Sequence, residues 1–210
     1  MEEYTFSDLG RVEAIAKLYE GTPYNPFETS KFEVGEPYNS YGNGSAMRVS
    51  PVGWIFDDID QTRKVARWTA EVTHNHPEGI KAAECTATVI FLARKGWHIN
   101  DIEEYVISEF GYDTDRIPDN QFVSCQSSMP ICLHALYSSH SFEDALRNAV
   151  SFGYDTDTYG VITGAMAEAY YGIDIQIMKI ALNYLPDEFI GVMDKFAEHR
   201  RKPIDGFHDL

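Results

Sequence analysis

Hydrophobic residues recur along most of the chain at the three- and four-residue spacing of amphipathic helices, and no stretch shows the strict alternation of a half-buried strand. Ser141 illustrates how such a segment begins, because its hydroxyl can cap a helix whose third residue is Asp144. The predicted helices cover residues 7–19, 55–72, 80–94, 102–110, 131–137, 141–152, 158–171, 175–184 and 187–199. The fold class that follows is all-α, a compact domain of many helices.

Between the first two predicted helices runs a long segment, residues 21–46, that is rich in proline, glycine and aromatic residues. Loops of this length inside a compact domain are usually functional or mobile. We therefore expect ligand contacts or a protein contact surface in this part of the chain.

The length of 210 residues fits one domain, and a hydrophobic content of 44% is sufficient for a buried core. No apolar run reaches the roughly 18 residues of a membrane span, and residues 1–30 show no secretory leader, so we expect a cytoplasmic protein with no membrane partner. Cys85, Cys125 and Cys132 lack the spacing of a zinc site or a disulfide framework, which predicts buried, reduced thiols.

The formal net charge is −16. A nucleic-acid partner is excluded on this ground, because affinity for a phosphate polymer comes largely from basic side chains. A small anionic ligand remains compatible with the sequence if a local pocket supplies metal ions, helix N-termini or backbone amides.

The strongest chemical signal is the segment 153–160, which places two carboxylates and two hydroxyls at consecutive positions between two predicted helices. Ionised carboxylates this close repel each other, and a divalent cation with oxygen ligands is the usual way to hold them together. An EF-hand starting at Asp155 is excluded, because its fifth and twelfth positions are Tyr159 and Met166. From these residues alone, either a cation site or a solvated helix start capped by aspartates is compatible with the sequence.

Two further segments carry a resemblance. Residues 39–48 read Asn-Ser-Tyr-Gly-Asn-Gly-Ser-Ala-Met-Arg, and residues 73–78 read Thr-His-Asn-His-Pro-Glu. Together with residues 153–158, and in this order, they resemble the ADP-ribosylglycohydrolase family, which includes the dinitrogenase reductase-activating glycohydrolases. The resemblance extends over about residues 40–199, so we interpret residues 1–210 as one domain of this kind whose residues 1–38 diverge.

The resemblance implies an all-α hydrolase that cleaves a ribosyl glycosidic bond of an ADP-ribosylated protein or a small ADP-ribosyl substrate. It also implies two divalent ions, Mg²⁺ or Mn²⁺, beside ADP-ribose. Asp155, Asp157 and Thr158 match the metal ligands, and the two aspartates match the catalytic positions. The predicted ligand contacts are Ser40, Tyr41, Gly42, Asn43, Gly44 and His74. A Gly-Asn-Gly turn suits this role, because glycine lets a phosphate approach the backbone closely.

Other residues near these motifs have simpler interpretations. His76, beside Pro77, is predicted to be structural, and Arg48 is predicted to orient the loop through its hydrogen bonds. Tyr41 and Met47 are also compatible with packing in the core.

The sequence also departs from the family pattern. Relatives carry a Thr-Asp-Asp-Thr motif ahead of the matched region that supplies the other half of the metal site, whereas residues 1–38 contain no Asp-Asp pair, and Tyr154 stands where the family usually has glycine. Three alternatives follow: a fragment of a longer hydrolase, an ADP-ribose or nucleotide binder without full activity, or a site completed by self-association or by a partner chain.

Overall fold

The computed structural model describes residues 37–115, 117 and 123–200, so the helix predicted over residues 7–19 and most of the segment 21–46 lie outside the described residues. The all-α prediction is confirmed, since the only β-type pairing in the described part is an isolated bridge between Gly42 and Ser124. The helices are α2 (Gly44–Arg48), α3 (Ser50–Ile55), α4 (Ile59–Glu71), α5 (Pro77–Arg94), α6 (Ile99–Phe110), α7 (Cys125–Tyr137), α8 (Phe142–Ser151), α9 (Thr156–Tyr171), α10 (Ile175–Leu182) and α11 (Asp187–Arg200).

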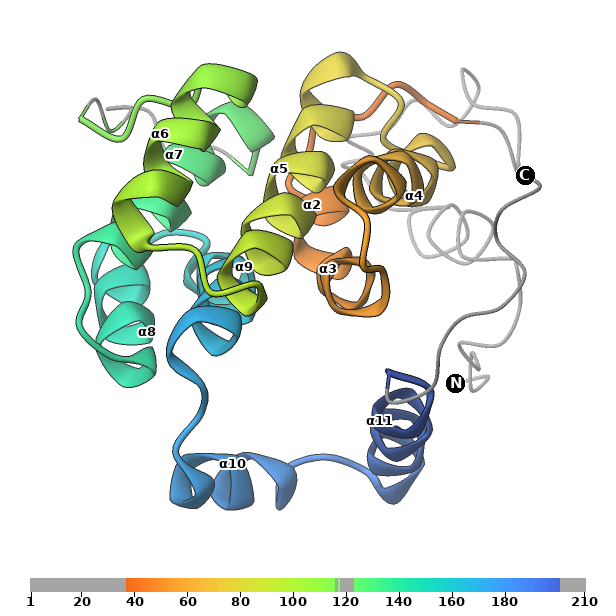
Figure 1. The fold of residues 1–210 in the computed structure, drawn as a ribbon, viewed down its shortest axis with the longest axis vertical. Helices are drawn as coiled ribbons and strands as arrows, with labels where there is room; N and C mark the ends of the chain where they lie inside the picture. The colour runs from red at the N-terminus through yellow and green to blue at the C-terminus, as the bar shows by residue number, and fades with distance from the viewer. Residues whose placement is uncertain (1–36, 116, 118–122, 201–210) are drawn as a thin grey trace, which may run out of the picture.

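Helix α5 forms the centre of the fold. It lies between α2, α3 and α4 on one side and α6, α7 and α9 on the other (Figure 1). Every residue from position 82 to 93 is buried, so this stretch of the helix has no solvent-exposed face. A helix that is buried on all sides is stable only when other helices surround it. Its several alanines let those neighbours approach closely.

Two predicted helices differ most from the structure in their boundaries. The segment 55–72 is broken at residues 56–58, where Phe56 is extended and Asp58 caps α4 by accepting a hydrogen bond from the Gln61 amide at 2.8 Å. The Phe56 carbonyl accepts a hydrogen bond from Arg94, which fixes this break against the end of α5. Helix α7 begins six residues before the predicted start at Ile131, because Pro130 lies inside the helix and does not end it.

The corner between α8 and α9 follows the predicted pattern. Ser141 caps α8 by accepting a hydrogen bond from the Asp144 amide at 3.1 Å. The chain then turns through two consecutive residues with left-handed backbone angles, Gly153 at φ 74° and Tyr154 at φ 67°. Glycine adopts this conformation freely, whereas tyrosine does so at a cost. The corner therefore holds a strained backbone position at Tyr154.

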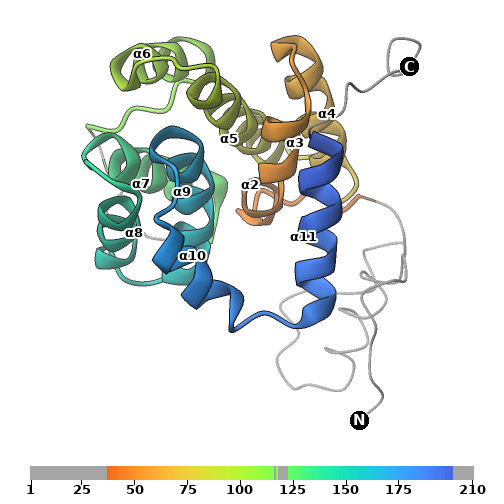
Figure 2. The same cartoon turned by 60° about the horizontal axis from the view of Figure 1, so that its bottom comes forward.

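Helices α10 and α11 extend from the rest of the molecule as an arm (Figure 2). Helix α10 contains no buried residue although it is largely apolar, and Ile180, Tyr184 and Val192 are among the exposed hydrophobic side chains of the arm. The arm contacts α3 where the Arg200 guanidinium lies 4.4 Å from the centre of the Trp54 ring. Among the described helices, none is both long and apolar enough to cross a membrane.

Candidate active site

The site is formed where the turn before α2 meets the first turn of α9. The side-chain amide of Asn43 donates to Oδ2 of Asp155 at 2.6 Å and to Oγ of Ser128 at 2.9 Å. Asn43 is only 7% exposed, so these bonds are protected from competition with water. Two segments separated by more than 100 residues, both predicted from sequence to belong to one site, therefore lie in direct contact.

Hydrogen bonds to α7 and to a neighbouring side chain hold the 40–44 turn in place. The backbone amide of Asn43 donates to the Val123 carbonyl at 3.1 Å, and the backbone amide of Cys125 donates to the Tyr41 carbonyl at 2.9 Å. The Gly42 amide donates to the Ser40 hydroxyl at 3.2 Å. The amides of residues 42 and 43 are thus already used inside the protein. A phosphate at this turn would therefore have to be met by other donors.

The three predicted metal ligands differ in environment. Asp155 occupies the N-cap position of α9, but its side chain accepts from Asn43 instead of capping the helix, and it is half-buried. Asp157 lies in the first turn of α9 and is exposed. The Thr158 hydroxyl is buried and lies 3.9 Å from Sδ of Met47. The start of a helix favours negative charge, so this position suits carboxylate side chains.

His74 lies in the segment of residues 72–76 that connects α4 to α5 and packs against the 40–44 turn. It is 7% exposed, and its Nδ1 lies 2.7 Å from the Thr73 hydroxyl. Burial and then the positive charge of Arg48 lower the pKa of His74 to about 4, so the imidazole is neutral at pH 7. A Cβ atom added to Gly44 would lie 3.1 Å from Nε2 of His74. Glycine at position 44 therefore gives the His74 ring room to pack against the backbone of the turn.

Three residues with alternative interpretations are placed by the structure. His76 caps α5 by accepting a hydrogen bond from the Glu78 amide at 3.1 Å, which agrees with the predicted structural role. Tyr41 is 54% exposed and contacts the His76 ring edge-on at 5.5 Å, and Met47 is also exposed. The core-packing interpretation is therefore wrong for Tyr41 and Met47. Ser128, which sequence reasoning did not select, is identifiable only as a polar residue within the apolar helix α7.

The donor set suits a hard cation in kind but is small in number. Two carboxylates and one hydroxyl are the oxygen ligands that Mg²⁺ and Mn²⁺ prefer, and together they supply about half of an octahedral shell. Within residues 37–115, 117 and 123–200, no group of three or more His, Cys, Asp or Glu side chains is placed to hold a metal ion. These donors are therefore of the right kind for a divalent ion, but the described residues do not by themselves form a complete metal site. A second ion would require donors from elsewhere.

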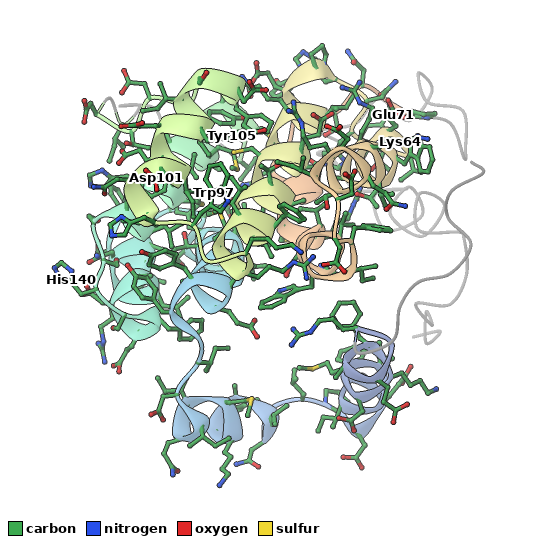
Figure 3. The ribbon with its side chains drawn as sticks, in the orientation of Figure 1. Lys64, Glu71, Trp97, Asp101, Tyr105 and His140 are labelled. Carbon is green, nitrogen blue, oxygen red and sulfur yellow. The ribbon has the colours of Figure 1, made fainter. Side chains whose placement is uncertain are left out.

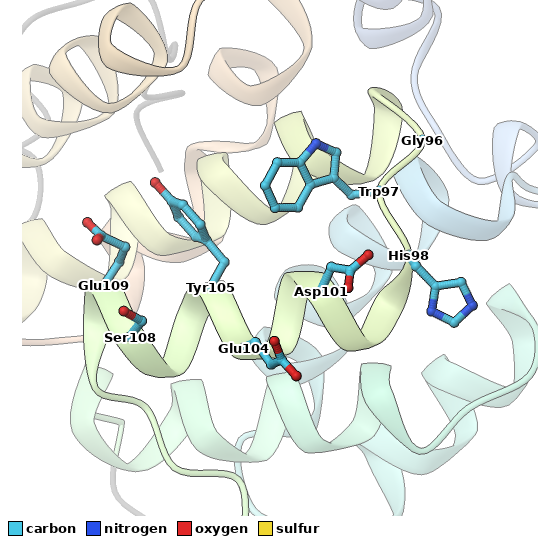
Figure 4. Close-up of a pocket in the computed structure, with 8 residues that line it drawn as sticks. All are labelled: Gly96, Trp97, His98, Asp101, Glu104, Tyr105, Ser108 and Glu109. Carbon is cyan, nitrogen blue, oxygen red and sulfur yellow. The ribbon is translucent and has the colours of Figure 1, made fainter.

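A separate hollow of about 730 Å³ lies on the outer side of α6 and contains none of the predicted site residues. Figure 4 shows Trp97 and Tyr105 forming one wall of this hollow, with ring centres 6.0 Å apart, and the carboxylate of Asp101 nearby. Figure 3 shows Lys64 and Glu71 on α4, away from Trp97, Asp101 and Tyr105 of this hollow. This hollow is open to solvent on a face other than that of the 40–44 turn.

Fold and site together define an all-α protein in which a glycine-bearing turn is bonded to an aspartate-bearing helix start. The family model described as ADP-ribosylglycohydrolase matches residues 5–202, and the chain belongs to this family. The match begins well before residue 40, where the motifs that carry the resemblance start.

Several relatives support this membership. The chain is 25% identical over 219 residues to ADP-ribosylhydrolase ARH3 of Homo sapiens, covering 79% of this chain and 59% of that protein. It is 25% identical over 179 residues to the ADP-ribosyl-[dinitrogen reductase] glycohydrolase of Rhodospirillum rubrum, covering 75% of this chain and 52% of that protein. The chain thus spans between about half and three fifths of these relatives.

A solved structure shows the same fold. It is described as an ADP-ribosylglycohydrolase-related protein complex and matches with a TM-score of 0.61 at 20% identity, covering 91% of this chain and 70% of that chain. At this identity the likeness concerns the arrangement of the helices.

Proposed function

We propose that this chain binds the ADP-ribose part of an ADP-ribosylated protein, or of a related small substrate, and hydrolyses the glycosidic bond at the ribose with the help of a divalent cation. The observation that carries the proposal is the 2.6 Å hydrogen bond from Asn43 to Asp155, because it joins the two motif segments into one site. The names of the two relatives, an ADP-ribosylhydrolase and an ADP-ribosyl glycohydrolase, support the same reaction class.

Each side chain has a role that its surroundings allow. Asn43 holds the Asp155 carboxylate in one orientation, and its second bond to Ser128 fixes the amide itself. The exposed Asp157 carboxylate is available to an ion or to a substrate hydroxyl. Bound Mg²⁺ or Mn²⁺ would offset the negative charge of the diphosphate and orient a water molecule. The diphosphate would lie near the turn that carries Gly42 and Gly44, where neutral His74 would face it.

Orientation is the main contribution of the protein under this proposal. Holding substrate and water in a reactive geometry can contribute several kcal/mol of the barrier reduction, roughly 7–11 kcal/mol in the most favourable cases. Such precision requires that the carboxylates do not move freely. The buried side-chain amide of Asn43 restricts the motion of the Asp155 carboxylate.

The test combines binding and turnover on the whole chain. Calorimetry with ADP-ribose, in Mg²⁺ or Mn²⁺ and again in a chelator, should show binding that the metal strengthens. With an ADP-ribosylated protein as substrate, Asp157→Asn should lower the rate of ADP-ribose release by about 100-fold, comparable to losing one preorganised electrostatic contact in other enzymes. Asp101→Asn is the matched control, since Asp101 is also exposed in the first turn of a helix.

Equal rates for Asp157→Asn, Asp101→Asn and the unmodified chain would remove the proposed role of α9. A second candidate function, binding without turnover, is favoured by the small number of carboxylates in the described part of the site. Metal-strengthened ADP-ribose binding without product release would support that second function instead.

A further inference from the structure

A chain of hydrogen bonds ends on His74. Nη2 of Arg48 donates to the Thr73 hydroxyl at 2.7 Å and to the Thr69 carbonyl at 2.9 Å. The Thr73 hydroxyl oxygen lies 2.7 Å from Nδ1 of His74. The three residues come from the end of α2 and from the segment that follows α4, so helix packing fixes their spacing.

The chemistry of the groups sets the direction of these bonds. A guanidinium has only donors, so the Thr73 oxygen must accept from Arg48. The single hydroxyl hydrogen of Thr73 is then free to point at Nδ1, and a hydroxyl oxygen that already accepts from a cation is a poorer acceptor for a second N–H. The nitrogen facing Thr73 therefore serves as acceptor. In a neutral imidazole the proton must then be on Nε2.

The nitrogen that carries this proton faces the glycine turn. A Cβ atom added to Gly44 would lie 3.1 Å from Nε2 of His74, and one added to Gly42 would lie 3.6 Å from it. These distances place Nε2 against the turn where the sequence predicts diphosphate contacts. Glycine at both positions lets the His74 ring pack directly against the backbone of the turn, close to the Ser40 hydroxyl, which lies 3.3 Å from a Cβ added to Gly42.

We propose that Arg48 and Thr73 are positioning residues that lock His74 as the Nε2–H tautomer and present a single neutral N–H donor, suited to a phosphate oxygen, over the 42–44 turn. The ligand part of this inference rests on the proposed function, whereas the tautomer part concerns the free protein. The low pKa of His74 is consistent with it, since the ring stays neutral across the physiological range.

The arrangement differs from the usual way of orienting histidine, in which a carboxylate or a backbone carbonyl accepts the Nδ1 proton. A carboxylate partner would favour the charged imidazolium, which could act as an acid. A hydroxyl supported by a guanidinium favours the neutral ring with the opposite tautomer. Arg48 and Thr73 therefore favour a His74 side chain that donates a hydrogen bond to a ligand over one that transfers a proton.

Nitrogen NMR on the full chain, free of ligand, tests the tautomer. Long-range imidazole correlations distinguish a protonated from an unprotonated ring nitrogen. We expect the unmodified chain to show His74 with bare Nδ1 and protonated Nε2. Thr73→Val should give a mixture of tautomers, and Thr73→Ser should restore the original pattern. Thr69→Val is the control, because the Thr69 hydroxyl donates to Ala66 and takes no part in the chain of bonds. A protonated Nδ1 in the unmodified chain would overturn the inference.

Titration with ADP-ribose tests the positioning role. A hydroxyl that fixes one neutral hydrogen bond should be worth about five- to tenfold in affinity, so Thr73→Val should bind that much more weakly, with Thr73→Ser and Thr69→Val near the unmodified value. Unchanged affinity in Thr73→Val, in a chain that binds ADP-ribose, would overturn the positioning role. The expected tautomer in a chain that does not bind ADP-ribose would support the tautomer assignment and overturn the proposed function.

Discussion

Replacing Asn43 by alanine is the most direct test of how the two halves of the site are joined. The amide makes one hydrogen bond to the Asp155 carboxylate and one to the Ser128 hydroxyl. A hydrogen bond to a charged group contributes about 1.5–3 kcal/mol and a neutral one about 1 kcal/mol. Water can reach half-buried Asp155 after the amide is removed, which lowers the first figure, so we expect a loss of about 2 kcal/mol.

For a chain of this size, a loss of about 2 kcal/mol corresponds to a fall of about 4–8 °C in the melting temperature. The assay is urea unfolding monitored by circular dichroism, with hydrogen exchange to locate the effect at the first turn of α9. Asn148→Ala is the matched control, because the Asn148 amide makes a single neutral bond to Ser139 at 2.8 Å. Its expected cost is about 1 kcal/mol.

The reasoning would be refuted if Asn43→Ala cost no more than Asn148→Ala, or if exchange at α9 were unchanged. Either outcome would mean that packing between α2 and α9, and not the buried amide, holds the two segments together.

Three further predictions follow from packing, thiol burial and histidine ionisation. Gly53→Ala should destabilise the fold by about 1–3 kcal/mol through overpacking, because the added Cβ would lie 2.6 Å from Cβ of Ile90. Gly191→Ala is the control and should not destabilise the fold, because no atom lies within 4 Å of its added Cβ. Calorimetric melting of the two variants tests this difference. Burial raises the pKa of the Cys125 and Cys132 thiols to about 12. A thiol reagent at pH 8 should therefore leave the folded chain unmodified and react only after denaturation. Fast labelling of the folded protein would contradict this prediction. The pKa of His74 is lowered to about 4 from 6.5, so its contribution to the free energy of unfolding is complete above pH 6.5 and is lost as pH falls toward 4. In urea unfolding, the free energy of unfolding of His74→Gln should therefore depend less on pH over this window than that of the unmodified chain.

The helices were predictable because burial imposes a period on the sequence. The cap of α8 by Ser141 and the buried state of the three cysteines were also predictable from local chemistry. The break at residues 56–58 was not, because it depends on Arg94 binding the Phe56 carbonyl across two helices. Local patterns contain no information about such a contact.

For the site, the relation between its two halves came from the family resemblance and not from periodicity. Nothing in the local sequence around Asn43 indicates that its amide reaches Asp155. The partners that complete the arrangement, Ser128 and Thr73, were missed because a single hydroxyl residue has no distinctive pattern. The assignment of metal and ligand roles stays a prediction.

The arm formed by α10 and α11 divides the molecule into parts of unequal stability. Helix α5 is enclosed by other helices, whereas α10 contains no buried residue. Local opening of α10 therefore costs much less free energy than opening of α5. Within the part of the chain that the structure describes, a protease acting on the native state should therefore cut first near residues 173–186, leaving the enclosed helices and the bonded turn of the site intact.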